Sequence, residues 1–367
     1  MNVQKTKETK WKQIDIELMR IIACFFVIFN HTETNGYFLF SLYDKHSLQF
    51  WIYLFLSVFC KFAVPLFFTI SGALMLDREP EPLNRLWRYR ILKMVIILVT
   101  WSLFYFFVEV YSGSFQLDFR EFVKQLYSFS WNYSFWYLYA YISMLMTLPL
   151  LQRIVKALTN RDFVYILILV ICFSSLLPVT EFILWQGKYN LNWNFRLQWL
   201  CTDIFIYPCL GYFLKARLKR FWTRKRIVLL WLTNIGTIII AGYLTYVKSN
   251  ITGILDESNS QSFHSVFAMI NCATIFVTSE YICSNYNFPD YVKRMICSMG
   301  ACTFGIYLLH VFYKEKITAI TQLWNIFHHQ LGLNYMLTAF LYCGIVFVLG
   351  YITTILLKRI PVLNKII

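Results

Sequence analysis

Charged residues are scarce in this chain of 367 residues: they make up only 14% of it, whereas 58% of its residues are hydrophobic. The mean hydropathy is +0.53. Ordinary soluble domains do not have this balance. Apolar runs recur from one end of the sequence to the other. We therefore expect a single membrane domain over residues 1–367, with no appended soluble domain.

Other features are missing as well. Ten cysteines are present, but no pair has the spacing of a zinc or thioredoxin motif, so we interpret them as small hydrophobic residues and predict no metal site. The first apolar run has no small-residue cleavage site, which indicates a retained helix preceded by a cytoplasmic tail, residues 1–13. No convincing internal repeat is visible, which argues against an inverted-repeat transporter.

Acidic residues are also few, with 19 Asp and Glu against 34 Lys and Arg, and the net charge is +15. Such an excess could indicate a nucleic-acid partner, so its distribution along the chain decides its meaning. Ten hydrophobic segments divide the sequence. They cover residues 14–34, 49–76, 91–111, 134–151, 162–179, 199–214, 227–247, 264–283, 300–320 and 335–357.

The basic residues alternate between the segments that connect these runs. If the N-terminus is cytoplasmic, 24 Lys and Arg fall in inner segments and 8 in outer segments. This is the asymmetry that the positive-inside rule describes. We therefore predict an all-α, polytopic membrane helical bundle of about ten transmembrane helices with cytoplasmic N- and C-termini. The basic excess indicates topology and not nucleic acid.

Arg20 and His31 lie eleven residues apart in the first hydrophobic segment. At about 100° per residue they point within roughly 20° of each other, about 16 Å apart along the helix. A cation inside a bilayer is costly and marks a functional site by default. Arg20 is therefore a candidate for binding an anion, and His31 is a candidate general base with Glu33 beside it. The alternative is a structural ion pair between Arg20 and Glu17, with His31 only capping the helix.

A second polar stripe lies in the ninth segment, where Thr303, Tyr307, His310 and Lys314 share one helix face. His310 is expected near the middle of the membrane, where it either lines a passage with Tyr307 or is a satisfied structural histidine.

The second segment carries Lys61 and ends with Ser71 and Gly72. A lysine so far from either end of a span needs an anionic partner, and Asp203 and Glu109 are the candidates. Pro65 and Gly72 permit a kink and a close backbone approach.

These residues fall within a series of short motifs in chain order. Arg20 and His31 have R-x10-H spacing after Ile14-Asp15. The later motifs are Phe67-Phe68-Thr69-Ile70-Ser71-Gly72, Phe135-Trp136-Tyr137-Leu138-Tyr139-Ala140 and Phe304-Gly305-Ile306-Tyr307-Leu308-Leu309-His310. Together they resemble the acyltransferase-3 family of integral-membrane O-acyltransferases. The matches run from residue 14 to residue 310.

The resemblance implies a multi-pass enzyme of the bacterial cytoplasmic membrane. Such an enzyme moves an acyl group, usually acetyl, from cytoplasmic acyl-CoA to a hydroxyl of a cell-envelope glycan. By position, Arg20 would contact the donor and His31 would act in the transfer, while Ser71, Tyr307 and His310 would line the substrate path. Many members have Ser at the position of Thr303, and the hydroxyl is retained here. Acyl-CoA would be a substrate, and no permanently bound cofactor is expected.

Membrane lipid, acyl-CoA and a glycan are thus the expected partners, and a homodimer is compatible with this view. The acceptor could be peptidoglycan, teichoic acid, a secreted polysaccharide or a lipid-linked precursor. Both acetyl and succinyl donors fit, as do direct transfer and a covalent acyl intermediate. The main rival is an exporter or flippase for polysaccharide or lipid-linked sugar without acyl chemistry. A membrane sensor or scaffold is a third class, although no signalling module is evident.

Overall fold

The computed structural model describes residues 13–186, 188–197, 199–255 and 264–367, and regular structure in these ranges is entirely helical. The first half contains α2 (Ile14–Asn30), α3 (Leu48–Cys60), α4 (Ala63–Met75), α5 (Leu83–Arg85), α6 (Leu92–Tyr111), α7 (Phe119–Ser128), α8 (Trp136–Ala157), α9 (Asn160–Ile171) and α10 (Leu177–Trp185). The second half contains α11 (Asp203–Tyr212), α12 (Arg224–Thr252), α13 (His264–Asn285), α14 (Asp290–Gly300), α15 (Thr303–Lys316), α16 (Thr318–Asn325) and α17 (Tyr335–Lys358).

Short 3-10 and π segments join or extend these helices. The 3-10 turns are η1 (Glu33–Asn35), η2 (Leu39–Leu42), η4 (Tyr133–Phe135), η6 (Trp193–Phe195) and η9 (Leu363–Lys365). The π turns are η3 (Leu86–Ile91), η5 (Cys172–Leu176), η7 (Phe213–Arg217) and η8 (Ile326–Gln330). The predicted tail, residues 1–13, lies outside the described part of the chain except for Gln13.

Membrane spans were predicted at ten places, and helix occurs at all ten. Within the described residues, seven helices are long and apolar enough to cross a bilayer, or eight if α14 and α15, which meet at a 60° bend, form one span. The 17-residue α2 and the 10-residue α11 are shorter than such a span requires. The chain is thus an all-α polytopic membrane protein with seven or eight candidate spans, fewer than the ten predicted.

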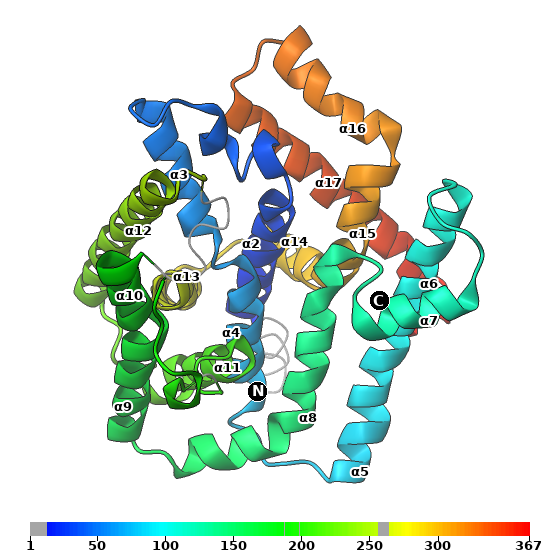
Figure 1. Cartoon of the computed structure of the whole chain (residues 1–367). Helices are drawn as coiled ribbons and strands as arrows, with labels where there is room; N and C mark the ends of the chain where they lie inside the picture. The colour runs from blue at the N-terminus through cyan, green and yellow to red at the C-terminus, as the bar shows by residue number, and fades with distance from the viewer. Residues whose placement is uncertain (1–12, 187, 198, 256–263) are drawn as a thin grey trace.

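The helix that carries Arg20, α2, lies at the centre of the bundle (Figure 1). It packs against α4, α13, α14, α15 and α17. Met19, Ala23 and Val27 recur every four residues on its buried side. This spacing places them on one helix face, so α2 is held by protein on several sides.

A break separates α3 from α4 at Lys61 and Phe62. Carbonyl groups freed by a break inside a membrane need other hydrogen-bond partners. The side-chain amide of Asn271 donates to Val58 at 3.4 Å, and Asn30 donates to the Cys60 carbonyl at 3.2 Å. The helix is thus interrupted before Pro65 and not at it, because Pro65 sits in the first turn of α4, where its missing N–H costs nothing.

The closest helix pairing joins α4 to α11. A Cβ on Gly72 would collide with the backbone of Pro208, and one on Gly211 would collide with the backbone of Thr69. The predicted close approach at Gly72 is confirmed. The helix continues past Ser71 and Gly72 to Met75.

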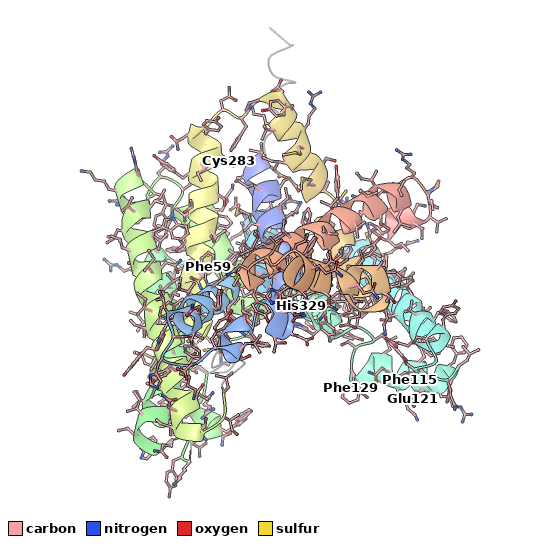
Figure 2. All side chains as sticks on the ribbon, turned by 90° about the horizontal axis from the view of Figure 1, so that it is seen from above. Phe59, Phe115, Glu121, Phe129, Cys283 and His329 are labelled. Carbon is pink, nitrogen blue, oxygen red and sulfur yellow. The ribbon has the colours of Figure 1, made fainter. Side chains whose placement is uncertain are left out.

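The segment 112–133, which connects two of the predicted spans, contains the ten-residue helix α7. Asp118 caps its N-terminus by accepting from the backbone N–H of Arg120. Phe115 and Phe129 flank this helix and lie with Glu121 at one margin of the molecule (Figure 2). Within α7, Phe119 is 58% exposed and Val123 is 59% exposed, so this helix presents apolar side chains outward, as an interfacial helix does.

Candidate active site

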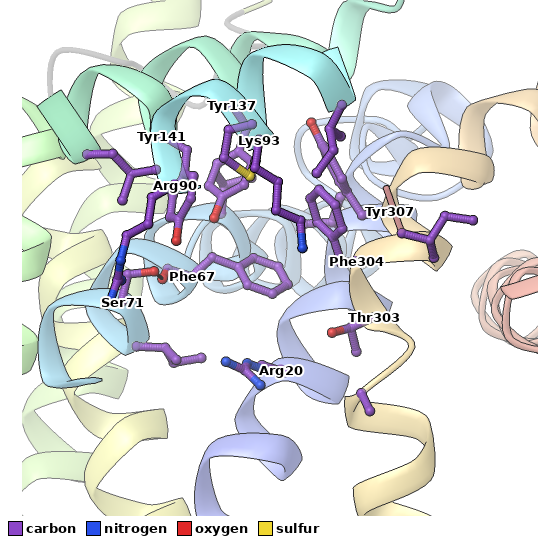
Figure 3. A pocket seen from close by; sticks show the side chains of 18 of the residues that line it. Arg20, Phe67, Ser71, Arg90, Lys93, Tyr137, Tyr141, Thr303, Phe304 and Tyr307 are labelled. Carbon is purple, nitrogen blue, oxygen red and sulfur yellow. Dashed lines mark hydrogen bonds between the residues drawn. The ribbon is translucent and has the colours of Figure 1, made fainter. Parts of the chain in front are cut away.

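A cavity of about 400 Å³ lies beside α2 (Figure 3). Residues of α2, α4, α6, α8, α14 and α15, together with the π turn η3, line it. From α2 come Arg20 and Val27, which are about 10 Å apart at 1.5 Å per residue. The cavity therefore follows α2 for about two turns. The polar and aromatic lining residues are Arg20, Phe67, Ser71, Tyr89, Arg90, Lys93, Tyr137, Tyr141, Thr303, Phe304 and Tyr307.

Arg20 points into this cavity while its other side is held by Glu17. The guanidinium lies 2.7 Å from one carboxylate oxygen of Glu17, and the Arg20 side chain is 33% exposed. The second Glu17 oxygen is buried without a hydrogen-bond partner beside Gly300, where a Cβ would collide with Glu17. The predicted ion pair is confirmed. It coexists with the functional interpretation, because a guanidinium has five N–H donors and Glu17 occupies only one edge.

Two more cations face the same space. Arg90 lies in the π turn η3 and Lys93 lies at the start of α6, and Arg90 pairs with Glu81. A second, more open cavity of about 680 Å³ adjoins the first and shares Tyr89 and Arg90 with it. Its other lining residues are Glu81, Pro82, Asn84, Arg85 and Arg88. The two cavities together form a basic region that can bind an extended anion.

Tyrosine rings stand across the cavity from Arg20, beside Arg90 and Lys93 (Figure 3). Tyr137 and Tyr141 stand one turn apart on α8, and the rings of Tyr137 and Tyr307 meet edge to face at 5.6 Å. Ser71 lines the cavity from α4 but donates its hydroxyl to the Phe67 carbonyl at 2.8 Å. The wall is thus mostly apolar in surface, with a few hydroxyl groups, as is usual for small-molecule sites.

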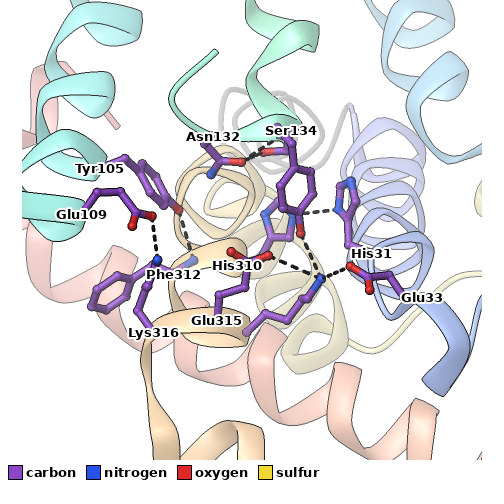
Figure 4. A network of polar contacts seen from close by, with 12 residues as sticks. His31, Glu33, Tyr105, Glu109, Asn132, Ser134, His310, Phe312, Glu315 and Lys316 are labelled. Carbon is purple, nitrogen blue, oxygen red and sulfur yellow. Dashed lines mark hydrogen bonds and ion pairs between the residues drawn. The ribbon is translucent and has the colours of Figure 1, made fainter. Parts of the chain in front are cut away.

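Beyond Tyr307, the two candidate histidines meet (Figure 4). His31 follows the end of α2, and its Nδ1 lies 2.9 Å from Nε2 of His310 on α15. Nδ1 of His310 lies 2.5 Å from the backbone oxygen of Tyr307. The Tyr307 hydroxyl in turn donates to the Ser134 carbonyl at 2.6 Å. His31 does not line the 400 Å³ cavity; it is connected to the lining residue Tyr307 through His310.

The turn of α15 that carries His310 is held in place by hydrogen bonds from α6. The Tyr105 hydroxyl of α6 donates to the Leu308 carbonyl at 2.9 Å and accepts from the Phe312 N–H at 3.1 Å. Tyr105 is among the largest fully buried side chains. It therefore ties two backbone groups on either side of His310 to α6.

An ionic cluster lies next to the histidines. The Lys314 ammonium is 3.2 Å from Glu33, 3.6 Å from Glu315 and 3.1 Å from the Tyr133 hydroxyl. The ring of Tyr133 also meets the ring of His31 edge to face at 5.0 Å. Glu33 thus contacts Lys314, the last residue of the predicted α15 stripe.

The structure brings together most of the predicted site residues, in two linked groups. Arg20, Ser71, Thr303 and Tyr307 line the cavity, while His31, Glu33 and His310 lie beyond Tyr307.

Lys61 lies elsewhere, at the break before α4, with its ammonium 5.4 Å from the centre of the Tyr37 ring. Of its two candidate partners, Glu109 pairs instead with Lys316 at 2.6 Å.

The lining residues that sequence reasoning missed include Tyr137, Tyr141, Arg90 and Lys93. The two cations were counted only as evidence of topology. The two tyrosines are four residues apart, a spacing that places them on one helix face, and this signal was available in the sequence.

The fold and this site define a polytopic membrane protein with an internal, cation-lined cavity next to a pair of histidines. A family model described as an acyltransferase domain matches residues 13–355, nearly the whole chain. The chain therefore belongs to the acyltransferase-3 family and is a membrane acyltransferase, which confirms the resemblance. No curated protein and no solved structure matches the chain.

Proposed function

We propose that this protein is an O-acyltransferase that moves an acyl group, in the first instance acetyl, from acyl-CoA to a hydroxyl of a cell-surface or lipid-linked glycan. One observation carries the proposal. Arg20 and Tyr307 line the same cavity, and the next turn of α15 places His310 against His31. The anion site and the candidate base are therefore connected through α15, which carries both Tyr307 and His310.

The donor occupies the basic side in this proposal. Coenzyme A has several phosphates at its nucleotide end, and a long, mostly neutral arm leads from there to the thiol. Arg85, Arg88 and Arg90 of the open cavity suit the phosphates, and the narrower cavity with Arg20 and the tyrosines suits the arm. Bidentate hydrogen bonding favours Arg over Lys for phosphate recognition.

The acceptor approaches from the side of His31. In the direct form of the reaction, the His31 imidazole takes the proton of the acceptor hydroxyl. At the same time, the oxygen of that hydroxyl attacks the carbonyl carbon of the thioester. A C–O bond forms, the C–S bond breaks, and the proton passes from His31 to the departing thiolate. The products are an ester and free coenzyme A.

Sidedness follows from the proposed topology. With a cytoplasmic N-terminus, Arg20 lies toward the cytoplasm, where acyl-CoA is made, and His31 lies toward the outer surface of the bacterial cytoplasmic membrane. Glu33, Lys314 and Tyr133 then face the arriving glycan.

The test is acyl transfer by the purified protein in detergent. We would incubate it with isotope-labelled acetyl-CoA and candidate glycans, and follow the label by mass spectrometry. We expect labelled ester on a glycan hydroxyl with the wild-type protein. His31→Ala should lower the rate by about 10²–10⁴-fold, the usual contribution of a general base, while His329→Ala, at an exposed histidine outside the site, should not.

Two results would contradict the proposal. One is wild-type acylation by the folded His31→Ala variant. The other is vesicle-reconstituted protein that moves an unmodified glycan across the bilayer and neither binds nor consumes acetyl-CoA, which would favour the exporter.

A further inference from the structure

The hydrogen bonds around His310 determine where its proton lies. Its Nδ1 is 2.5 Å from the Tyr307 backbone oxygen, three residues earlier in α15. A carbonyl oxygen can only accept a hydrogen bond, so Nδ1 of His310 must carry a proton. In a neutral imidazole the other nitrogen is then an acceptor. Nε2 of His310 therefore presents a lone pair.

That lone pair faces Nδ1 of His31 at 2.9 Å. Two lone pairs do not make a hydrogen bond, so Nδ1 of His31 must be the donor. A doubly protonated His310 would reverse this bond, but His310 is only 1% exposed, and the Lys314 ammonium lies one turn further along α15. A second buried positive charge there would cost free energy. The proton of neutral His31 thus sits on Nδ1.

We propose that His310 is a positioning residue that selects the tautomer of His31. With its proton on Nδ1, His31 has an unprotonated Nε2, and this nitrogen is the base in the reaction proposed above. In hydrolases that use a serine, histidine and aspartate triad, a buried carboxylate holds the base in the right tautomer. Here a second imidazole does so, and the Tyr307 carbonyl orients that imidazole in turn.

The proton path is complete without any further group. Nε2 of His31 takes the hydroxyl proton and later gives it to the thiolate, while the Nδ1 proton stays hydrogen-bonded to His310. This inference rests on the proposed function for its chemistry, but the tautomer itself can be measured without any acyl transfer.

The first experiment is nitrogen-15 NMR of the full-length protein in lipid bilayers, with only histidine ring nitrogens labelled. Signals are assigned by comparison with His31→Ala and with His310→Gln. We expect a protonated Nδ1 and an unprotonated Nε2 on both His31 and His310. A proton on Nε2 of His31 overturns the inference whether or not the protein transfers acyl groups.

The second experiment compares two substitutions of His310. The amide oxygen of the side chain in His310→Gln can still accept from Nδ1 of His31, whereas His310→Leu offers no acceptor. We expect kcat to fall at least tenfold more in His310→Leu than in His310→Gln, with KM for acyl-CoA unchanged in both. In His310→Leu, the NMR spectrum should show His31 in both tautomers.

Specific results would count against this role. Equal kcat for the two variants, with one unchanged His31 tautomer, would reduce His310 to a packing residue. His329→Gln and His329→Leu are the matched controls on the exposed histidine, and neither should alter kcat or the His31 signals. If wild-type protein transfers no acyl group while His31 keeps its predicted tautomer, the proposed function fails but the positioning by His310 stands.

Discussion

The site has two ends, one at Arg20 and one at the pair His31 and His310, and they differ in how their charged groups are paired. At the end nearer the N-terminus of α2, Arg20, Arg90 and Lys93 line the cavity, and among the residues that the structure describes they form ion pairs with Glu17 and Glu81 only. Cations are in excess there, and they face open space.

At the other end the balance is reversed. Lys314 contacts two carboxylates, those of Glu33 and Glu315. The histidines beside it meet each other, and the carbonyl of Tyr307 completes their hydrogen bonding. Each of these residues has at least one polar partner within the protein. This difference indicates that the end with Arg20 is arranged to bind an anion, whereas the end with His310 holds a reactive group, His31, in a fixed orientation.

The sharpest way to test this comparison is Arg20→Lys. Lysine keeps the charge but loses the planar pair of donors that binds a phosphate or carboxylate in two places. Charge-assisted hydrogen bonds of this kind contribute about 1.5–3 kcal/mol. We expect KM for acyl-CoA to rise about 10- to 100-fold in steady-state kinetics. Unchanged donor affinity would show that Arg20 serves only to pair with Glu17.

A smaller effect, on stability, is expected from Gly72→Ala. The added methyl group would collide with the Pro208 backbone and push α4, which lines the cavity, away from α11. Overpacking of this kind costs about 1–3 kcal/mol. Thermal unfolding in detergent should begin at a lower temperature.

Gly236→Ala is the matched control, because nothing lies within 4 Å of a Cβ at this helical glycine. Replacing a helical glycine by alanine at such a site stabilises by up to about 1 kcal/mol. Equal melting temperatures for the two variants would show that the α4–α11 contact can relax.

The smallest effect is expected from Lys93→Gln. Lys93 is one of several cations around the cavity and forms a point-charge contact, so its loss should raise KM for acyl-CoA only a few-fold. The remaining dependence of KM on salt should also become weaker, because one fewer exposed cation attracts the donor. Assays at two ionic strengths measure both. A change in kcat with constant KM would show that Lys93 acts in the transfer step. The two ends of the site would then not be divided into one that binds the donor and one that holds the reactive group.

Helical spacing explains which parts of the site were predictable. Arg20 and Val27 share a cavity, and Thr303, Tyr307, His310 and Lys314 all face the same side, because 3.6 residues per turn fixes the direction of each side chain in a regular helix. The contact between His31 and His310 joins residues 279 positions apart. Sequence could place both on polar faces but could not show that those faces meet.

Irregular backbone explains the rest. The π turn η3 shifts the register ahead of α6, so the direction of Arg90 does not follow from α-helical spacing. The break after Cys60 likewise frees Lys61 from the periodicity of either helix. In the connection 112–133, the polar stretch before Phe119 gave no sign of the short helix α7, whose apolar residues face outward.

The glycine contact between α4 and α11 has a mechanical consequence. Because their main chains touch with no side chain between them, neither helix can slide or rotate without the other, and the pair moves as one rigid unit. We therefore expect a bulky donor to displace the side of the cavity where η3 interrupts the regular helix before α6, while Ser71 of α4 keeps its place.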